Sequence, residues 1–115
     1  MVMTSEGLNR IRDLMNADVT TGTLGTGTNA ANITDTDLQT GDAASAISTT
    51  NTVADRQLVT QYTLPSTSGT TGTYTEYKNH SGSTDFDRIV FTGISFTKNG
   101  VEEIAVVKKY FFRGT

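Results

Sequence analysis

Two apolar stretches near the end of the sequence flank an Asn-Gly pair, and this arrangement restricts the fold more than any other feature. The stretches are residues 88–97 and 101–112, with Asn99 and Gly100 between them. Asn-Gly is the preferred centre of a type I′ turn, so the pattern predicts a β-hairpin. Residues 88–97 carry apolar side chains on both faces, which is typical of a central strand that is covered twice. We therefore expect this hairpin to form the stability core, with Phe96 buried in it.

Two earlier segments also alternate between apolar and polar side chains and predict strands. Residues 56–64 form the first segment, which carries Tyr62. Residues 73–78 form the second segment, which carries Tyr74 and Tyr77. Together with the hairpin, these strands predict an antiparallel β body.

An amphipathic helix is expected at residues 5–16, ahead of all the strands. Its apolar stripe consists of Leu8, Ile11, Leu14 and Met15. Thr4 or Ser5 can cap its first turn, because a side-chain oxygen there accepts a hydrogen bond from a backbone amide. A helix of about three turns is marginal in isolation, so we expect it to dock on the β body.

The segment between the helix and the β body is polar. Residues 18–24 predict a short strand, which Gly25 and Gly27 end. Residues 28–52 show little periodicity and predict a long loop with at most one or two short strands. A loop of this length inside a compact domain usually indicates function, contact with a partner, or disorder.

Composition supports a β-rich fold in one domain. About a fifth of the residues are Thr, which is β-branched and favours strands. A length of 115 residues predicts a single domain, 1–115, with a helix at 1–17, a short strand and long polar loop at 18–55, and an antiparallel β body at 56–115. The predicted fold class is mainly β: an antiparallel sheet or small β-sandwich with one N-terminal amphipathic α-helix.

Charge and hydropathy restrict the partners. A net charge of −3 argues against non-specific binding to nucleic acid, which requires a cationic face. Basic and aromatic residues do gather at 108–113, but alternation sends neighbours to opposite faces, so a packed strand is the favoured interpretation. Apolar runs are too short to span a bilayer, so no membrane partner is expected. The first ten residues lack the pattern of a secretory signal, and we expect the product to fold inside the cell that makes it.

Three features invite a chemical interpretation, and each has a plainer one. Residues 25–30 formally match the dinucleotide fingerprint G-x-G-x-x-A, but no helix start or βαβ unit follows, which favours a simple turn.

Asp35, Asp37 and Asp42 offer oxygen ligands for a cation. Their spacing does not match an EF-hand, and Asx-type turn hydrogen bonds of Asp35 and Asp37 to nearby backbone amides are the favoured interpretation.

The single histidine, His80, lies in a segment of turn-forming residues, 79–84. We expect it to be solvated there. Without Cys, a second His or a spaced pair of carboxylates, the sequence predicts no catalytic, cofactor-binding or metal-binding residues, no cofactor and no enzymatic activity.

Residues 24–38, LGTGTNAANITDTDL, resemble a segment that recurs in tail-fibre and baseplate-type proteins of tailed bacteriophages. In that family a helix of the type T-x-x-G-L-x-x-I-R-D-x-x-N precedes the G-T-G-T turn, and the matching residues are Thr4, Gly7, Leu8, Ile11, Arg12, Asp13 and Asn16. Near the other end the family has an N-G turn and an acidic-apolar strand, matched by Asn99, Gly100, Val101, Glu103, Ile104, Ala105 and Val106. The family's prolines after the G-T-G-T turn and its glycine in the last strand are absent.

The resemblance implies a structural virion component of a tailed phage, made in the host cytoplasm and placed in or near the tail tip, baseplate or fibre. Such a protein acts by assembly with other virion structural proteins and with copies of itself. The family is commonly trimeric, so a homo-oligomer is expected, a trimer first, with the helix and residues 28–52 near the subunit contact. The limited apolar supply for covering both faces of residues 88–97 also favours a repeated subunit.

Two alternatives stay open at this point. One is a capsid decoration or head-surface protein, which composition does not distinguish from a tail protein. The other is a small carbohydrate- or cell-surface-binding β module, in which Tyr62, Tyr74 and Tyr77 stack on sugar rings.

Overall fold

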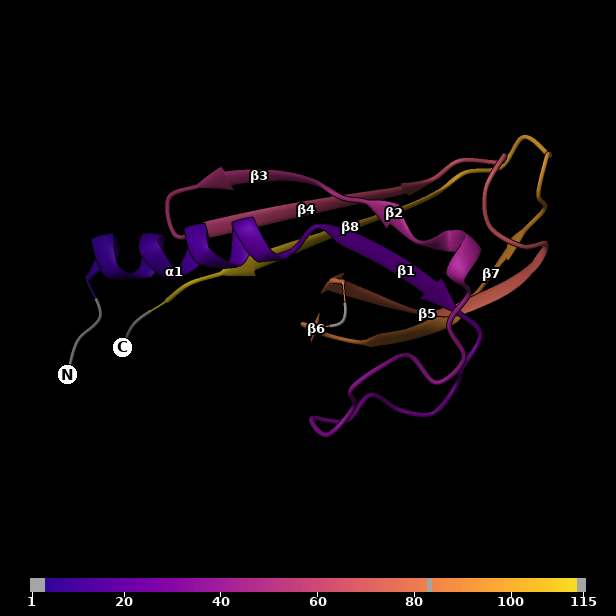
Figure 1. Cartoon of the computed structure of the whole chain (residues 1–115), viewed down its shortest axis with the longest axis horizontal. Coiled ribbons are helices and arrows are strands. Elements are labelled where there is room, and N and C mark those ends of the chain that lie inside the picture. The colour runs from indigo at the N-terminus through magenta and orange to yellow at the C-terminus, as the bar shows by residue number, and fades with distance from the viewer. Residues whose placement is uncertain (1–3, 83, 114–115) are drawn as a thin grey trace.

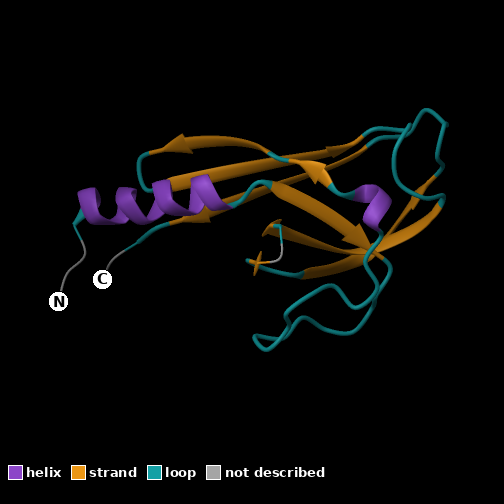
Figure 2. Ribbon diagram, in the orientation of Figure 1, coloured by secondary structure: helices purple, strands orange, loops and turns teal. Residues whose placement is uncertain are grey.

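Two antiparallel sheets, one α-helix and one short 3₁₀ helix make up the computed structural model, which describes residues 4–82 and 84–113. The first sheet contains β1 (Thr21–Gly25), β2 (Ile47–Ser48), β5 (Gly72–Ser81), β6 (Thr84–Asp85) and β7 (Ile89–Phe96). The second contains β3 (Thr50–Ala54), β4 (Gln57–Leu64) and β8 (Ile104–Phe111). The predicted class, mainly β with antiparallel sheets and one N-terminal helix, is confirmed (Figures 1 and 2).

β5 is the central strand of the first sheet. It pairs with β1 along one edge and with both β6 and β7 along the other, and β2 pairs with the far side of β1. In the second sheet β4 lies between β3 and β8. Only Thr49 separates β2 from β3, so the chain passes from one sheet to the other almost without a break.

The core lies between the two sheets and draws on both. Its buried members are Leu24, Tyr62, Leu64, Tyr74, Tyr77, Phe96 and Ile104. The rings of Tyr62 and Tyr77 meet edge to face across the sheets, with centroids 5.1 Å apart. The Tyr62 hydroxyl donates to the Ser45 carbonyl at 2.6 Å, which satisfies a polar group that burial would otherwise leave unpaired. Alternation in residues 56–64 therefore identified a true core strand, β4.

The predicted hairpin at residues 88–112 is wrong. β7 pairs with β5 and β8 pairs with β4, so the two strands belong to different sheets. A turn does form there, but it is centred on Lys98 and Asn99 and not on Asn99 and Gly100: the Gly100 amide donates to the Thr97 carbonyl at 3.1 Å. Asn99 has a φ of 64°, whereas Gly100 has no positive φ, so the turn is not the predicted type I′. The Asn99 amide donates to the Ser66 carbonyl at 2.5 Å, so the turn is fixed against the 65–71 loop and not between paired strands.

β7 is also not a strand covered on both faces. It lies at an edge of the first sheet, and of its eight residues four are exposed, three are partly buried and one is buried. Phe96, at its end, is buried as expected, but the Ile94 side chain is 42% exposed. Ile94 lies opposite the core residue Tyr74 in the ladder, so the core-facing side of β7 is left partly open at this position.

The helix α1 (Ser5–Asp18) begins at the predicted cap. The Thr4 hydroxyl accepts a hydrogen bond from the Gly7 amide at 3.1 Å. Of the apolar stripe, only Leu8 is buried, whereas Ile11 and Leu14 are 43% and 54% exposed. α1 contacts β3 and β4 at the end of the second sheet that projects beyond the first (Figure 1).

The helix is attached largely by polar contacts. Arg12 donates to the Ala54 carbonyl at 2.5 Å, and the Asn9 side chain accepts from the Arg56 amide at 2.6 Å. Both contacts fall on the turn between β3 and β4. The expected docking is confirmed, but much of the apolar stripe remains on the surface.

Residues 26–42 form a long loop. Its only β-bridge to another part of the described chain is an isolated one between Gly25 and Gly41. The remainder of the predicted loop contains a short 3₁₀ helix (Ala43–Ser45), β2 and most of β3. Ile33 is fully exposed on this loop and Leu38 is buried.

Candidate functional site

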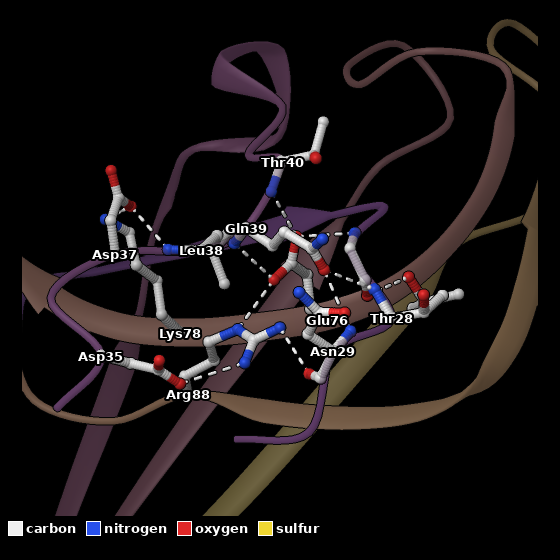
Figure 3. Close-up of polar contacts among 12 residues, drawn as sticks. Thr28, Asn29, Asp35, Asp37, Leu38, Gln39, Thr40, Glu76, Lys78 and Arg88 are labelled. Atoms are coloured by element: carbon white, nitrogen blue, oxygen red, sulfur yellow. Dashed lines mark hydrogen bonds and ion pairs between the residues drawn. The ribbon is translucent and has the colours of Figure 1, made fainter. Parts of the chain in front are cut away.

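A buried carboxylate holds the 26–42 loop against the first sheet (Figure 3). Glu76, on β5, is completely buried. Its Oε2 accepts from the Gly27 and Thr40 amides at 2.7 and 2.8 Å. Its Oε1 accepts from the Gln39 amide at 2.8 Å and from the Arg88 Nε at 2.9 Å. Four donors thus converge on one side chain and tie both ends of the loop to β5.

The pairing of β5 with β7 is irregular beside this carboxylate. Between Tyr74 and Glu76 the register shifts by two residues, and the extra residues lie in β7. Tyr74 and Tyr77, on either side of this point, both belong to the core. Glu76 is left on the other face, beneath the loop.

Arg88 extends the cluster to the middle of the loop. Its guanidinium donates to the Asn29 carbonyl at 2.8 Å and to the Asp35 carboxylate at 3.0 Å, in addition to Glu76. The Arg88 side chain is 6% exposed. Leu38 is the one buried apolar side chain of the 26–42 loop. The loop is therefore ordered mainly by hydrogen bonds and by the Arg88 guanidinium, which Glu76 and Asp35 share.

The electrostatics keep this cluster ionised. Burial raises the pKa of Glu76, but the hydrogen bonds from Thr40, Arg88, Gln39 and Gly27 outweigh it and hold that pKa below its usual value. The hydrogen bond to Glu76 raises the pKa of Arg88. The hydrogen bond from the Asn32 amide, with the contribution of Arg88, lowers the pKa of Asp35. A carboxylate with all its oxygens engaged and a depressed pKa is suited to holding structure, and it is poorly suited to accepting a proton in catalysis.

Gly27 allows the loop to approach the carboxylate this closely. A Cβ atom on Gly27 would lie 2.6 Å from the Glu76 Oε2 and 2.3 Å from the Gln39 Cβ. The fingerprint-like segment 25–30 is thus a turn in which the Gly27 amide binds a protein carboxylate. No helix follows it, because the next described helix is the short one at Ala43–Ser45.

The three aspartates of the predicted loop have separate partners. Asp35 pairs with Arg88, and Asp37 pairs with Lys78 at 2.8 Å. Asp42 accepts from the Ala44 amide at 3.1 Å, and also from the Tyr74 hydroxyl. Within residues 4–82 and 84–113, no group of three or more His, Asp or Glu side chains is arranged to hold a metal ion.

The expected backbone hydrogen bonds of these aspartates are present. The Asp37 Oδ1 accepts from the Leu38 amide at 2.7 Å. The Asp35 Oδ2 accepts from the Asn32 amide at 2.8 Å. Local amide hydrogen bonds of Asp35 and Asp37 are therefore confirmed, although neither bonds the amide two residues further on, as an Asx turn does.

The prediction of a solvated turn at His80 is wrong. β5 continues to Ser81 and pairs with β1, which covers the ring and leaves it 8% exposed. One ring nitrogen lies 2.8 Å from the Thr23 hydroxyl and the other lies 3.0 Å from the Gly82 carbonyl. Both nitrogens are occupied by structural contacts.

The tyrosines proposed for stacking on sugars are core residues. Tyr62 and Tyr77 are completely buried and Tyr74 is 2% exposed. Burial raises the pKa of Tyr74 to about 12 and those of Tyr62 and Tyr77 further. These rings present no face to a ligand. The prediction that the three tyrosines stack on sugar rings is therefore wrong, and their role is structural.

The exposed large apolar side chains are spread over several elements instead. They are Ile11 and Leu14 on α1, Ile33 on the loop, Val53 on β3, Phe86 after β6, Ile94 on β7, Val101 before β8, and Val107 and Phe111 on β8. A shallow groove runs between β7 and β8 and is lined by Ile89, Phe91, Thr92, Ile94, Ala105, Val106 and Val107. The sequence reveals the strand residues through alternation, but not that the two strands occupy the edges of different sheets.

Glu76 and Arg88 were missed by the sequence analysis. The available signal was a single Glu in a strand otherwise expected to alternate, flanked by Tyr74 and Tyr77 on either side. Its partners in the loop are the backbone amides of Gly27, Gln39 and Thr40, and backbone groups cannot be recognised from the residue type.

Comparison with protein-family models, curated proteins and solved structures finds no match for this chain. Across the residues that the structure describes, no helix has the length and hydropathy to cross a bilayer.

Proposed function

We propose that this protein is a structural virion component of a tailed phage, in or near the tail tip, baseplate or fibre, and that it acts by assembly rather than by catalysis. The phage assignment rests on the resemblance of residues 24–38, the helix pattern before them and the Asn99-Gly100 segment. A role in assembly is supported by one structural observation: apolar side chains remain exposed on α1, on the 26–42 loop and along the open edges of both sheets.

This distribution fits contact with other virion proteins and with copies of the chain. Ile33 is fully exposed on a loop that hydrogen bonds hold in place, so it is displayed at the surface and not collapsed onto the core. Ile11 and Leu14 are similarly displayed on a helix that polar contacts attach to the β3–β4 turn. Contiguous apolar patches at a surface mark interaction sites, and the groove between β7 and β8, lined mostly by apolar side chains, adds such a surface to these single groups.

The proposal is tested by locating the chain in particles from the phage that encodes it. Mass spectrometry of purified virions should detect the protein, and its density should lie at the tail tip, baseplate or fibre. Density on the head would support the capsid-decoration alternative. Absence from purified particles would contradict both.

A pair of helix variants tests whether the exposed apolar stripe is used. Leu14→Asp should reduce incorporation into particles, because it places a charge where an apolar contact is expected. Ser5→Asp adds the same charge at an exposed position two and a half turns away, on the opposite side of the same helix, and should be tolerated. Equal incorporation of the two variants would contradict a contact through this face of α1.

A further inference from the structure

β8 has a free edge along its whole length. In the described residues it pairs only with β4. The Phe112 amide donates to the Arg56 carbonyl at 2.9 Å, just beyond the paired strands. Because hydrogen-bonded positions alternate in an antiparallel pair, the even-numbered residues of β8 direct their amides toward β4. Residues 105, 107, 109 and 111 therefore direct theirs toward the open edge.

The sequence along this edge is complementary to itself. It reads Glu102-Glu103, four apolar residues, then Lys108-Lys109. In an antiparallel pair of two β8 strands centred on Val106, Glu103 of one copy lies opposite Lys109 of the other, and the two-fold symmetry repeats the pair. Ala105 lies opposite Val107, also twice.

This register is the one that the backbone and the charges favour together. It joins odd-numbered residues, whose amides face the open edge, so the new ladder has donors and acceptors in place. Centring the pair on Ala105 would put Glu103 opposite Val107 and Glu102 opposite Lys108, but Lys108 is already paired with Asp87. Centring it on Val107 would put Glu103 opposite Phe111. Only the register centred on Val106 pairs Glu103 with Lys109.

The side chains concerned are available. Glu103 and Lys109 are exposed, and neither takes part in an ion pair among residues 4–82 and 84–113. Lys108, in contrast, is already paired with Asp87 beside Tyr110. The Val107 side chain is 55% exposed. Lys at a sheet edge usually discourages pairing, but here an acidic residue in the second copy would neutralise it.

We infer that two copies of this chain pair through β8, with the two-fold axis at Val106, so that their second sheets join into one continuous sheet. The occupant of the open edge is thus a second copy of the chain. This contact is independent of whether the particle position is tail or head. It also differs from the trimer that the resemblance implies, because a two-fold contact closes on itself as a dimer.

A charge exchange tests the register. Glu103→Lys and Lys109→Glu each replace two attractive cross-strand pairs with two repulsive ones, and each should weaken the dimer at least about tenfold. The double variant Glu103→Lys/Lys109→Glu restores opposite charges and should recover the dimer. Sedimentation over a concentration series measures all four proteins. Single variants that dimerise as well as the original chain would overturn the inference.

Cysteine variants test the position of the axis, since the chain contains no Cys of its own. Residues at a non-hydrogen-bonded antiparallel pair have Cα atoms about 4.5 Å apart, within reach of a disulfide. Val106→Cys should therefore form covalent dimers on mild oxidation. Ala105→Cys faces Val107 of the second copy and should not. Cross-linking of Ala105→Cys with none of Val106→Cys would overturn the register.

Blocking the edge gives a third readout. Val107→Pro removes an amide that faces the open edge and leaves the β4–β8 ladder intact, so it should give a folded monomer. Circular dichroism checks that it is folded, and Glu103→Lys serves as the second variant if it is not. An original chain that is monomeric at about 100 μM, or that forms a trimer insensitive to these changes, would overturn the two-fold contact. Incorporation into virions would still test the proposed function separately.

Discussion

Glu76 and Arg88 form a buried ion pair, with the Arg88 Nε 2.9 Å from the Glu76 Oε1 and side chains 0% and 6% exposed. Neither residue is near the other in the sequence, and neither belongs to the apolar core. The pair joins β5 and the start of β7 to the loop through the amides of Gly27, Gln39 and Thr40. The molecule thus has two centres of stability, an aromatic core between the sheets and a polar one beneath the loop.

Removing the charge of Glu76 should destabilise the protein strongly. Glu76→Gln leaves the Arg88 guanidinium buried with a weaker partner, and breaking a buried pair costs about 3–5 kcal/mol. Urea denaturation should show the loss in free energy of unfolding. The matched control is Asp55→Asn, which removes an exposed pair with Arg56 whose side chains are 67% and 47% exposed. That change should cost less than about 1 kcal/mol. Equal effects would mean that the buried pair contributes no more than an exposed one.

Acid should release the loop before the core unfolds. The pKa values of Glu76, Asp35 and Asp37 are all lowered in the folded protein. A carboxyl group whose pKa is lower in the folded state than in the unfolded state adds stability above the unfolded value, and that stability is lost as the pH falls through the folded value. The unfolded values are 4.5 for Glu and 3.8 for Asp. Stability should therefore be constant near neutral pH and decline below about pH 4.5.

The measurement is the urea midpoint as a function of pH, combined with amide exchange of residues 26–42. Glu76→Gln should show a shallower decline than the original chain, because one of the titrating groups is gone. A decline of equal steepness in both proteins would assign the acid sensitivity to other carboxylates.

Gly27 should not tolerate a side chain. Gly27→Ala places a Cβ 2.3 Å from the Gln39 Cβ and 2.6 Å from the Glu76 Oε2, so the loop must shift and weaken its bonds to Glu76. We expect a loss of about 1–3 kcal/mol, typical of inserting a methyl group where there is no room. Gly41→Ala is the control in the same loop, since its Cβ would meet nothing closer than 3.6 Å. Thermal melting of both variants distinguishes steric exclusion from a general sensitivity of the loop.

Local patterns in the sequence predicted local structure well. Alternation over residues 56–64 identified β4 to within one residue, and Thr4 caps α1 as its side chain predicts. The Asn99 turn also has the positive φ that its sequence favours. Each of these features depends on a few neighbouring residues.

Features that depend on distant partners were not predictable in the same way. Turn chemistry at Asn99 specifies a reversal of the chain but not which strands pair, and β7 and β8 find partners in β5 and β4. The pairing of β5 with β7 shifts by two residues between Tyr74 and Glu76, where β7 has the extra residues, and no local pattern in the sequence marks this shift. His80 was misplaced for a related reason: its burial comes from β1, far away in the sequence.

Phe96 should remain the most sensitive apolar position of β7 even though no hairpin forms there. Its side chain is 2% exposed and its ring lies 5.9 Å from that of Tyr74, centroid to centroid. Phe96→Ala should cost about 3–5 kcal/mol, a large part of the stability of a domain of this size. Val101→Ala, at a position 95% exposed, removes apolar atoms in the adjoining loop and should leave the melting temperature nearly unchanged. A Phe96→Ala variant with the same melting temperature as the original chain would show that the sheets do not depend on this contact. β7 would then be held mainly by its ladder with β5.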